Sequence, residues 1–143
     1  MIEEKGTRDW VCFRVAEAYL LAGEAYYRAG DVDNALKYIN MLRRNCAIKG
    51  KEKEMEISAS DLSVDFILDE RARELISEEN RRMTLVRTNT LAERIKLNGD
   101  MEPAAPSNKV ITGFDANIHT LLPIPLTEIQ LNKDGDLKQN PGY

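Results

Sequence analysis

Apolar residues recur at helical spacing in the first third of the chain. No proline occurs between residues 10 and 29, and one set of apolar positions there is separated by 4, 4, 3 and 4 residues: Val11, Val15, Tyr19, Ala22 and Tyr26. This spacing predicts one face of an α-helix. Gly30 can end that helix, and Asp31 can cap the next one.

A second helix is expected over residues 32–44, where another set of residues forms one stripe: Ala35, Ile39, Leu42 and Cys46. A two-residue break between such helices predicts an antiparallel helical hairpin, which we place at residues 10–46. The small residues Gly23 and Ala35 let the two helices approach closely, and Tyr26 is expected to fill the space beside them.

A third helix is expected after a polar stretch. Residues 48–60 predict a loop or a frayed helix end. The pattern then predicts a helix over residues 61–79, with one apolar stripe formed by Leu68, Ala72 and Leu75. One or two shorter helices follow, with a joint near Asn89. Together these elements predict a second helical hairpin over residues 61–97.

The last third of the chain has a different character. Residues 99–143 contain all five prolines and show little helical period. Pro123 and Pro125 predict an extended run, after which residues 127–129 can start a short helical turn. An irregular segment of this length is expected to lie on other structure. A closing turn and a terminal plug are expected from the last residues: Asn140, Pro141, Gly142 and Tyr143.

Composition and charge exclude several classes of protein. Of 143 residues, 20 are Lys or Arg and 24 are Asp or Glu, a formal net charge of −4. That balance provides no basic surface for a nucleic acid. No apolar stretch is long enough to span a bilayer, and residues 1–6 lack the apolar core of a signal peptide. Two cysteines and one histidine exclude a disulfide scaffold, a four-thiolate zinc site and a two-histidine site, so we expect no cofactor and no metal.

Charges are concentrated in one segment, which holds five acidic residues and five arginines but no lysine: Asp69, Glu70, Glu74, Glu78, Glu79, Arg71, Arg73, Arg81, Arg82 and Arg87. Helical spacing predicts ion pairs for Asp69–Arg73, Glu78–Arg82, Glu70–Arg73 and Glu78–Arg81. The planar guanidinium suits fixed, partly buried pairing. A glycosidase needs two carboxyl groups across a cleft, whereas Glu74 and Glu78 are expected on one helix face. We therefore expect ion pairing and no catalytic residue here.

Three blocks of sequence, in order, carry a family resemblance. The first is the hairpin over residues 14–40, whose key residues fall on the positions of a tetratricopeptide repeat: Tyr19, Ala22, Gly23, Tyr26, Ala35 and Ile39. The second is ILDERAREL at residues 67–75, followed by Glu78, Arg81 and residues 85–88. The third is the Leu-Pro-Ile-Pro run at residues 122–125, followed by Glu128, Asn132 and residues 139–143. Together they resemble the C-terminal part of the SusD/RagB family, the surface nutrient-binding lipoproteins of Bacteroidetes.

The resemblance implies an all-α fold of tetratricopeptide-like hairpins with an irregular, proline-containing end, of which residues 1–143 form a single C-terminal segment. It also implies a lipid-anchored parent on the outer membrane at the cell surface. Such a parent binds glycans or other nutrients, works with a TonB-dependent (SusC-like) transporter and is not an enzyme. No ligand residue is implied in this segment. We expect structural roles for Gly23, Tyr26, Ala35, Glu70, Arg71, Arg73, Glu74, Glu78, Arg81, Arg87, Pro123, Pro125, Asn140, Pro141 and Tyr143.

Three residues depart from the family pattern. Arg82 stands where a large aromatic residue is usual, so the second hairpin is expected to pack more loosely. Thr84 replaces a usual aspartate. Asn89 replaces a usual glycine, but asparagine can adopt the same left-handed turn.

Two alternatives concern how the first hairpin is used. A stand-alone tetratricopeptide module for protein–protein interaction is the alternative function, although it would predict further repeats. If no neighbouring helix covers the hairpin, its stripe of Val15, Tyr19 and Tyr26 is exposed, and copies of the chain should self-associate. A disulfide between Cys12 and Cys46 stays open, because the hairpin could bring these residues together.

Three further features are expected to be structural. His119 is interpreted as a hydrogen-bonding residue. A faint resemblance to a calcium loop is interpreted as a turn, because the glycine is misplaced and a distal glutamate is missing: Asn132, Asp134 and Asp136. The aromatic residues that could stack on sugars are expected to pack instead: Trp10, Tyr26, Tyr27, Tyr38 and Phe114.

Overall fold

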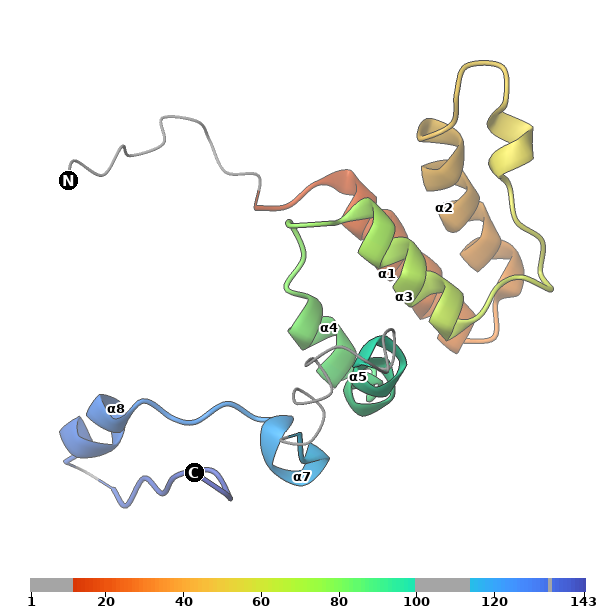
Figure 1. Ribbon diagram of the computed structural model, residues 1–143. Helices are drawn as coiled ribbons and strands as arrows, with labels where there is room; N and C mark the ends of the chain where they lie inside the picture. The colour runs from red at the N-terminus through yellow and green to blue at the C-terminus, as the bar shows by residue number, and fades with distance from the viewer. Residues whose placement is uncertain (1–11, 100–113, 134) are drawn as a thin grey trace, which may run out of the picture. The chain divides into compact units, whose positions relative to one another are not determined.

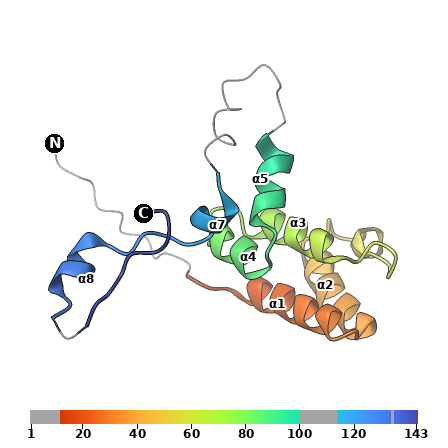
Figure 2. The ribbon, with the colours of Figure 1, turned by 90° about the horizontal axis from the view of Figure 1, so that it is seen from below.

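The computed structural model describes residues 12–99, 114–133 and 135–143. Every regular element in these ranges is a helix, which confirms the all-α fold class. The chain divides into two compact units, residues 1–79 and 80–143, drawn in Figures 1 and 2. Within the described ranges, no helix is both long enough and apolar enough to cross a membrane.

The described part of the first unit is a helical hairpin with a third helix packed on it. Figures 1 and 2 both show α3 running beside α1. Trp10, where the first helix was expected to start, lies outside the described residues, and α1 begins only after an extended Arg14. The elements of this unit are α1 (Val15–Arg28), α2 (Val32–Asn45), the 3-10 turn η1 (Glu52–Met55) and α3 (Val64–Glu74).

The junction between α1 and α2 has the predicted stop and cap. Gly30 adopts a left-handed conformation with φ +84°, and the Asp31 carboxylate accepts the backbone N–H of Asn34 at 3.1 Å. Hydrogen bonds from the side chain and the backbone of Asn34 lower the pKa of Asp31 from its ordinary 3.8. The cap therefore stabilises the fold above pH 3.8, and this contribution is lost as the pH falls through the lowered pKa.

The close approach of α1 and α2 depends on Gly23, as predicted. A Cβ atom at this position would lie 2.7 Å from Cδ1 of Ile39 and 3.6 Å from the carbonyl oxygen of Ala35. Both Ala35 and Ile39 are fully buried. Any larger residue at position 23 would have to displace Ile39.

The buried face of α1 differs from the predicted stripe by one residue. Ala16, Leu20 and Gly23 are buried, whereas Val15 is 62% exposed. The shift follows from the packing. Because α1 contacts both α2 and α3, its buried side is the one directed at these two helices. Tyr26 stacks on Tyr38, with ring centroids 5.6 Å apart and an interplanar angle of 8°, and it remains 36% exposed.

The polar stretch at residues 48–60 is held by a side chain of α2. The Asn40 side chain donates to the carbonyl oxygen of Ile57 at 3.0 Å and accepts the Ile57 N–H at 2.9 Å. This pair of bonds satisfies both backbone groups of Ile57 as a neighbouring strand would. The predicted loop thus contains one short turn, η1, and Asn40 holds it near its C-terminal end, at Ile57.

Helix α3 is shorter than predicted. It ends at Glu74 instead of Glu79, because Ser77 adopts a left-handed conformation with φ +63°, and the N–H groups of Glu78 and Glu79 both donate to the carbonyl oxygen of Leu75. The predicted stripe was wrong in part. Leu68 and Leu75 are buried, but Ala72 is exposed and Ile67 is buried in its place.

The second unit begins inside the segment expected to form a second hairpin. Within the first unit α3 packs on α1, and within the second unit α4 packs on α5. The predicted joint is confirmed: Asn89 has φ +57° between α4 and α5. The helices of this unit, within the described residues, are α4 (Arg81–Arg87), α5 (Leu91–Gly99), α7 (Ala116–His119) and α8 (Leu126–Leu131).

The C-terminal segment is held by side chains that bind backbone groups. The Gln139 amide accepts the Ile124 N–H at 2.7 Å and donates to the Ile124 carbonyl oxygen at 2.8 Å. The predicted short helix after Pro125 is confirmed as α8. The closing turn is also confirmed, since Tyr143 N–H donates to Asn140 at 3.3 Å. Tyr143 is 47% exposed, however, so the expected plug is not a buried one.

Replacing Gly23 with a large residue should destabilise the hairpin. Gly23→Leu places side-chain atoms where Ile39 now packs, and we expect it to lower the free energy of unfolding by about 2–3 kcal/mol in urea titrations followed by circular dichroism. Ala25→Leu is the matched control, because Ala25 is exposed on the same helix. It should change the free energy by less than about 0.5 kcal/mol. Equal losses in both variants would contradict the role of the close helix approach.

Candidate functional site

Arg71 is a buried charge at the centre of the first unit. The Ser63 side chain caps α3 by accepting the Phe66 N–H at 3.0 Å, and the helix then carries Arg71 against α1. Only 2% of the Arg71 side chain is exposed. Its Nε donates to Glu79 Oε1 at 2.8 Å, and its Nη2 lies 3.2 Å from Glu17 Oε1. One guanidinium therefore joins α1, α3 and the turn that follows α3.

A second arginine fastens the start of α1 to the end of α3. Arg14 Nη1 lies 2.6 Å from Glu74 Oε1, and Arg14 Nε lies 2.6 Å from Glu78 Oε2. Arg14 also donates to the backbone carbonyl of Glu74. The hydrogen bonds to Glu78 and then to Glu74 raise the pKa of Arg14 further above its already high ordinary value. The arginine thus stays charged at every physiological pH.

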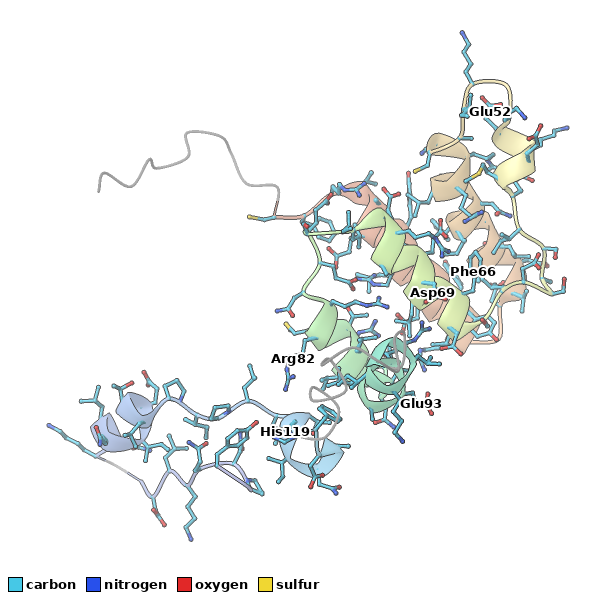
Figure 3. All side chains as sticks on the ribbon, in the orientation of Figure 1. Glu52, Phe66, Asp69, Arg82, Glu93 and His119 are labelled. Carbon is cyan, nitrogen blue, oxygen red and sulfur yellow. The ribbon has the colours of Figure 1, made fainter. Side chains whose placement is uncertain are left out.

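A third cluster, around Glu70, connects α2 to α3. Glu70 Oε2 accepts from Arg43 Nη1 at 2.7 Å and from Arg73 Nη2 at 2.5 Å. The guanidinium groups of Arg43 and Arg73 also lie 5.5 and 5.8 Å from the centre of the Phe66 ring, which Figure 3 labels on α3. Arg43 Nε donates to the Met55 carbonyl oxygen at 2.6 Å. The cluster therefore also ties down the turn η1.

The predicted ion pairs have mixed outcomes. The pair Glu70–Arg73 is confirmed. The pair Glu78–Arg82 is wrong, because α3 ends before Glu78 and that carboxylate binds Arg14 instead. Arg82 extends from α4 toward the segment that carries His119 and donates to the carbonyl oxygens of His119 and Leu121 (Figure 3).

Three partners in these clusters were not singled out from the sequence: Arg14, Glu17 and Arg43. Arg14 and Glu17 lie at the N-terminal end of α1, which faces α3, and Arg43 lies in the last turn of α2. Arg14 precedes α1, Glu17 lies in its first turn and Arg43 stands beside Arg44, and no local spacing distinguishes such charged residues from solvated ones. Only the packing of α3 on the hairpin reveals these partners.

The remaining expected structural residues lie mainly in the second unit. Arg81 and Arg87 are the first and last residues of α4. The run through Pro123 and Pro125 is held partly by Asn140, the residue before Pro141. The Asn140 side-chain amide donates to the Leu122 carbonyl oxygen at 2.7 Å. His119 Nδ1 accepts the Asp115 N–H at 2.7 Å, which confirms its hydrogen-bonding role.

The two cysteines are free thiols, so the open possibility of a disulfide is not realised. Cys46 Sγ lies 3.2 Å from Glu74 Oε2 and donates a hydrogen bond to it. Partial burial, then the hydrogen bond to Glu74, raises the pKa of the Cys46 thiol above 9.0. A thiol in this environment is a poor nucleophile.

The chemistry available to this site is ionic cross-linking. Glu74 and Glu78 bind the same guanidinium, so they do not face each other across a cleft as the two carboxyl groups of a glycosidase do. Among the residues that the structure describes, no group of three or more histidine, cysteine or acidic side chains could hold a metal ion. The ion pairs of this site connect α3 to α1 and to α2.

These features define a class of protein: a helical protein whose tetratricopeptide-like hairpin is joined to a third helix by buried ion pairs. The model of the SusD family matches residues 3–143. The chain belongs to the SusD family.

Two curated relatives are similar over most of this chain. A SusD-like protein of Formosa agariphila is 32% identical over 124 residues, which is 85% of this chain and 22% of the relative. The starch-binding protein SusD of Bacteroides thetaiotaomicron is 33% identical over 137 residues, which is 94% of this chain and 22% of the relative. The chain thus spans about a fifth of the length of these relatives. No solved structure matches it.

Removing the buried guanidinium should lower the free energy of unfolding far more than removing an exposed one. Arg71→Met leaves Glu17 and Glu79 without their shared partner, and we expect a loss of about 3–5 kcal/mol in the free energy of unfolding. Arg73→Met is the matched control on the same helix, because 57% of the Arg73 side chain is exposed. It should cost at most about 1 kcal/mol in the same urea titration. A loss at Arg71 no greater than at Arg73 would show that the buried cluster does not hold the unit together.

Proposed function

We propose that this chain is the scaffold portion of a cell-surface nutrient-binding protein and performs no catalysis. The longer protein would bind glycans or other nutrients, be anchored by lipid in the outer membrane and pass its ligand to a TonB-dependent, SusC-like transporter. Membership of the SusD family supports this proposal, as does the starch-binding relative. The segment spans only 22% of its relatives, so the ligand residues are expected elsewhere in the longer protein.

The observation that supports the scaffold role most strongly is that two glutamates of α3 are ion-paired with arginines. Glu70 and Glu74 are the carboxylates that a reaction or a polar ligand would need, and both are bound by arginines from α1 or α2. Groups bound in this way hold helices together and are not available to a substrate.

The tyrosines of the hairpin also support a structural role. Sugar-binding aromatic residues need a free ring face, and the stacking of Tyr26 on Tyr38, with ring centroids 5.6 Å apart, covers one face of each ring. Tyr19 lies 6.2 Å from the same Tyr38 ring, at a tilt of 37°. The three rings thus pack against one another, as aromatic clusters within a scaffold do.

Affinity gels that contain soluble starch and other polysaccharides test this role. The gene product that carries this segment should be retarded by its nutrient, whereas residues 1–143 alone should not be. Tyr26→Ala in the longer protein should change the dissociation constant by less than about twofold. Purification from detergent-solubilised outer membranes should also recover the transporter.

Two outcomes would contradict the scaffold role. One is retardation of residues 1–143 alone that Tyr26→Ala abolishes, which would make the tyrosine cluster a glycan site. The other is release of reducing sugar from the polysaccharide, which would make the protein an enzyme.

A second candidate is self-association of residues 1–143 through the outer face of α1, and one observation favours it. Val15 and Tyr26, which share one face of this helix, are 62% and 36% exposed. The acidic side chains of α1 are paired: Glu17 with Arg71 of α3, and Glu24 with Arg28 of the same helix. A chain of net charge −4 repels its copies over most of its surface, so an uncharged face is where two copies can meet.

Light scattering after gel filtration at micromolar concentrations tests this second candidate. Wild-type chain should elute as a dimer, and Tyr26→Glu should shift it to a monomer, because the dimer would bury two new carboxylates. Ile48→Glu is the control, since Ile48 is 75% exposed in the loop after α2. It should leave the dimer unchanged. A folded wild-type monomer would refute the proposal.

A further inference from the structure

The second unit contains a hollow between α4 and the segment that follows α7. Its volume is about 360 Å³, and its apolar walls are Met83, Val86 and Leu122. Met83 and Leu122 are 68% and 65% exposed, so the walls present a large apolar area to water. The volume is near the lower end of the range for small-molecule sites, about 300–1,000 Å³, which suits a ligand with a single ring.

Arg82 is fixed at the edge of this hollow. Its Nη2 donates to the carbonyl oxygens of His119 and Leu121, and the bond to Leu121 measures 3.3 Å. These bonds use one of the three guanidinium nitrogens. Nε and Nη1 of Arg82 make no hydrogen bond to any residue that the structure describes. The side chain is therefore held in place while it keeps donors for a further acceptor.

The charges of the residues that line the hollow favour a negatively charged acceptor. Arg82 and Arg87 are both positive, and the other described lining residues are neutral: Asn80, Met83, Val86, Thr120 and Leu122. This local excess occurs in a chain whose formal net charge is −4. Another hollow of the same unit differs, because Lys96 and Asp115 line it together. Of these two hollows, the one at α4 combines an apolar wall with described charges of a single sign.

We propose that this hollow binds a small aromatic carboxylate. The carboxylate would accept from the unused donors of Arg82, and the flat ring would lie against Met83, Val86 and Leu122. A planar guanidinium stacks on aromatic rings, and the thioether of a methionine makes favourable contacts with them. An aliphatic acid would gain the charge interaction but not these ring contacts. The proposal is independent of the scaffold role of the first unit.

Titration calorimetry of residues 1–143 with trans-cinnamate tests the site. Cinnamate should bind, and the neutral amide of the same acid should bind at least about tenfold more weakly, because it cannot make a charge-assisted hydrogen bond. 3-Cyclohexylpropanoate, which keeps the charge but has no flat ring, should also bind more weakly than cinnamate.

Two wall variants and one control locate the binding. Met83→Glu and Leu122→Glu each add a negative charge to the wall at an exposed position, and each should weaken cinnamate binding by about tenfold or more. Leu131→Glu is the matched control, because Leu131 is 70% exposed on α8 and does not line the hollow. It should bind cinnamate like the wild type. Circular dichroism of each variant verifies its helix content.

Three results would overturn the proposal. The first is no binding of cinnamate to the wild-type chain. The second is equal binding of the acid and its amide, which would show that Arg82 does not recognise the charge. The third is equal weakening by Leu131→Glu and the folded wall variants, which would place the ligand elsewhere.

Discussion

The first unit depends on one buried guanidinium. Arg71 is almost completely removed from water, and a charge in that position is tolerated only when carboxylates and good hydrogen-bond geometry compensate its lost hydration. Glu17 and Glu79 provide that compensation from two different segments. The geometry then fixes the placement of α3 on α1, since a small slip would leave the charge uncompensated. Arg14 and Glu70 extend the same principle to the start of α1 and the last turn of α2.

The hairpin itself is held by a steric constraint. Gly23 allows α1 and α2 to approach until Ile39 occupies the space where a larger side chain would lie. The ion pairs then act on helices that are already close, which keeps their distances short and their carboxylates partly desolvated. Apolar contact and charge pairing thus support each other in this unit.

In the second unit, the main constraint is the backbone of the proline-containing segment. A segment with Pro123 and Pro125 lacks two backbone donors, so it cannot pair along its length with a strand. Side chains satisfy its backbone instead: Gln139 binds both backbone groups of Ile124, and Asn140, Tyr143 and Arg82 bind carbonyl oxygens. This arrangement leaves apolar side chains such as Leu122 exposed beside α4, and it creates the hollow at Arg82.

The sequence by itself determined that helices form in these segments and where two of the breaks between them lie. The stop at Gly30, the cap at Asp31 and the turn at Asn89 follow from residues within about four positions of each other, and local backbone preferences are enough to predict them. Only the tertiary structure decided the phase of the buried face of α1, the early end of α3 and the partners of Arg71. The physical reason is distance along the chain: Glu17 lies 54 residues from Arg71, and only packing brings two such charges together.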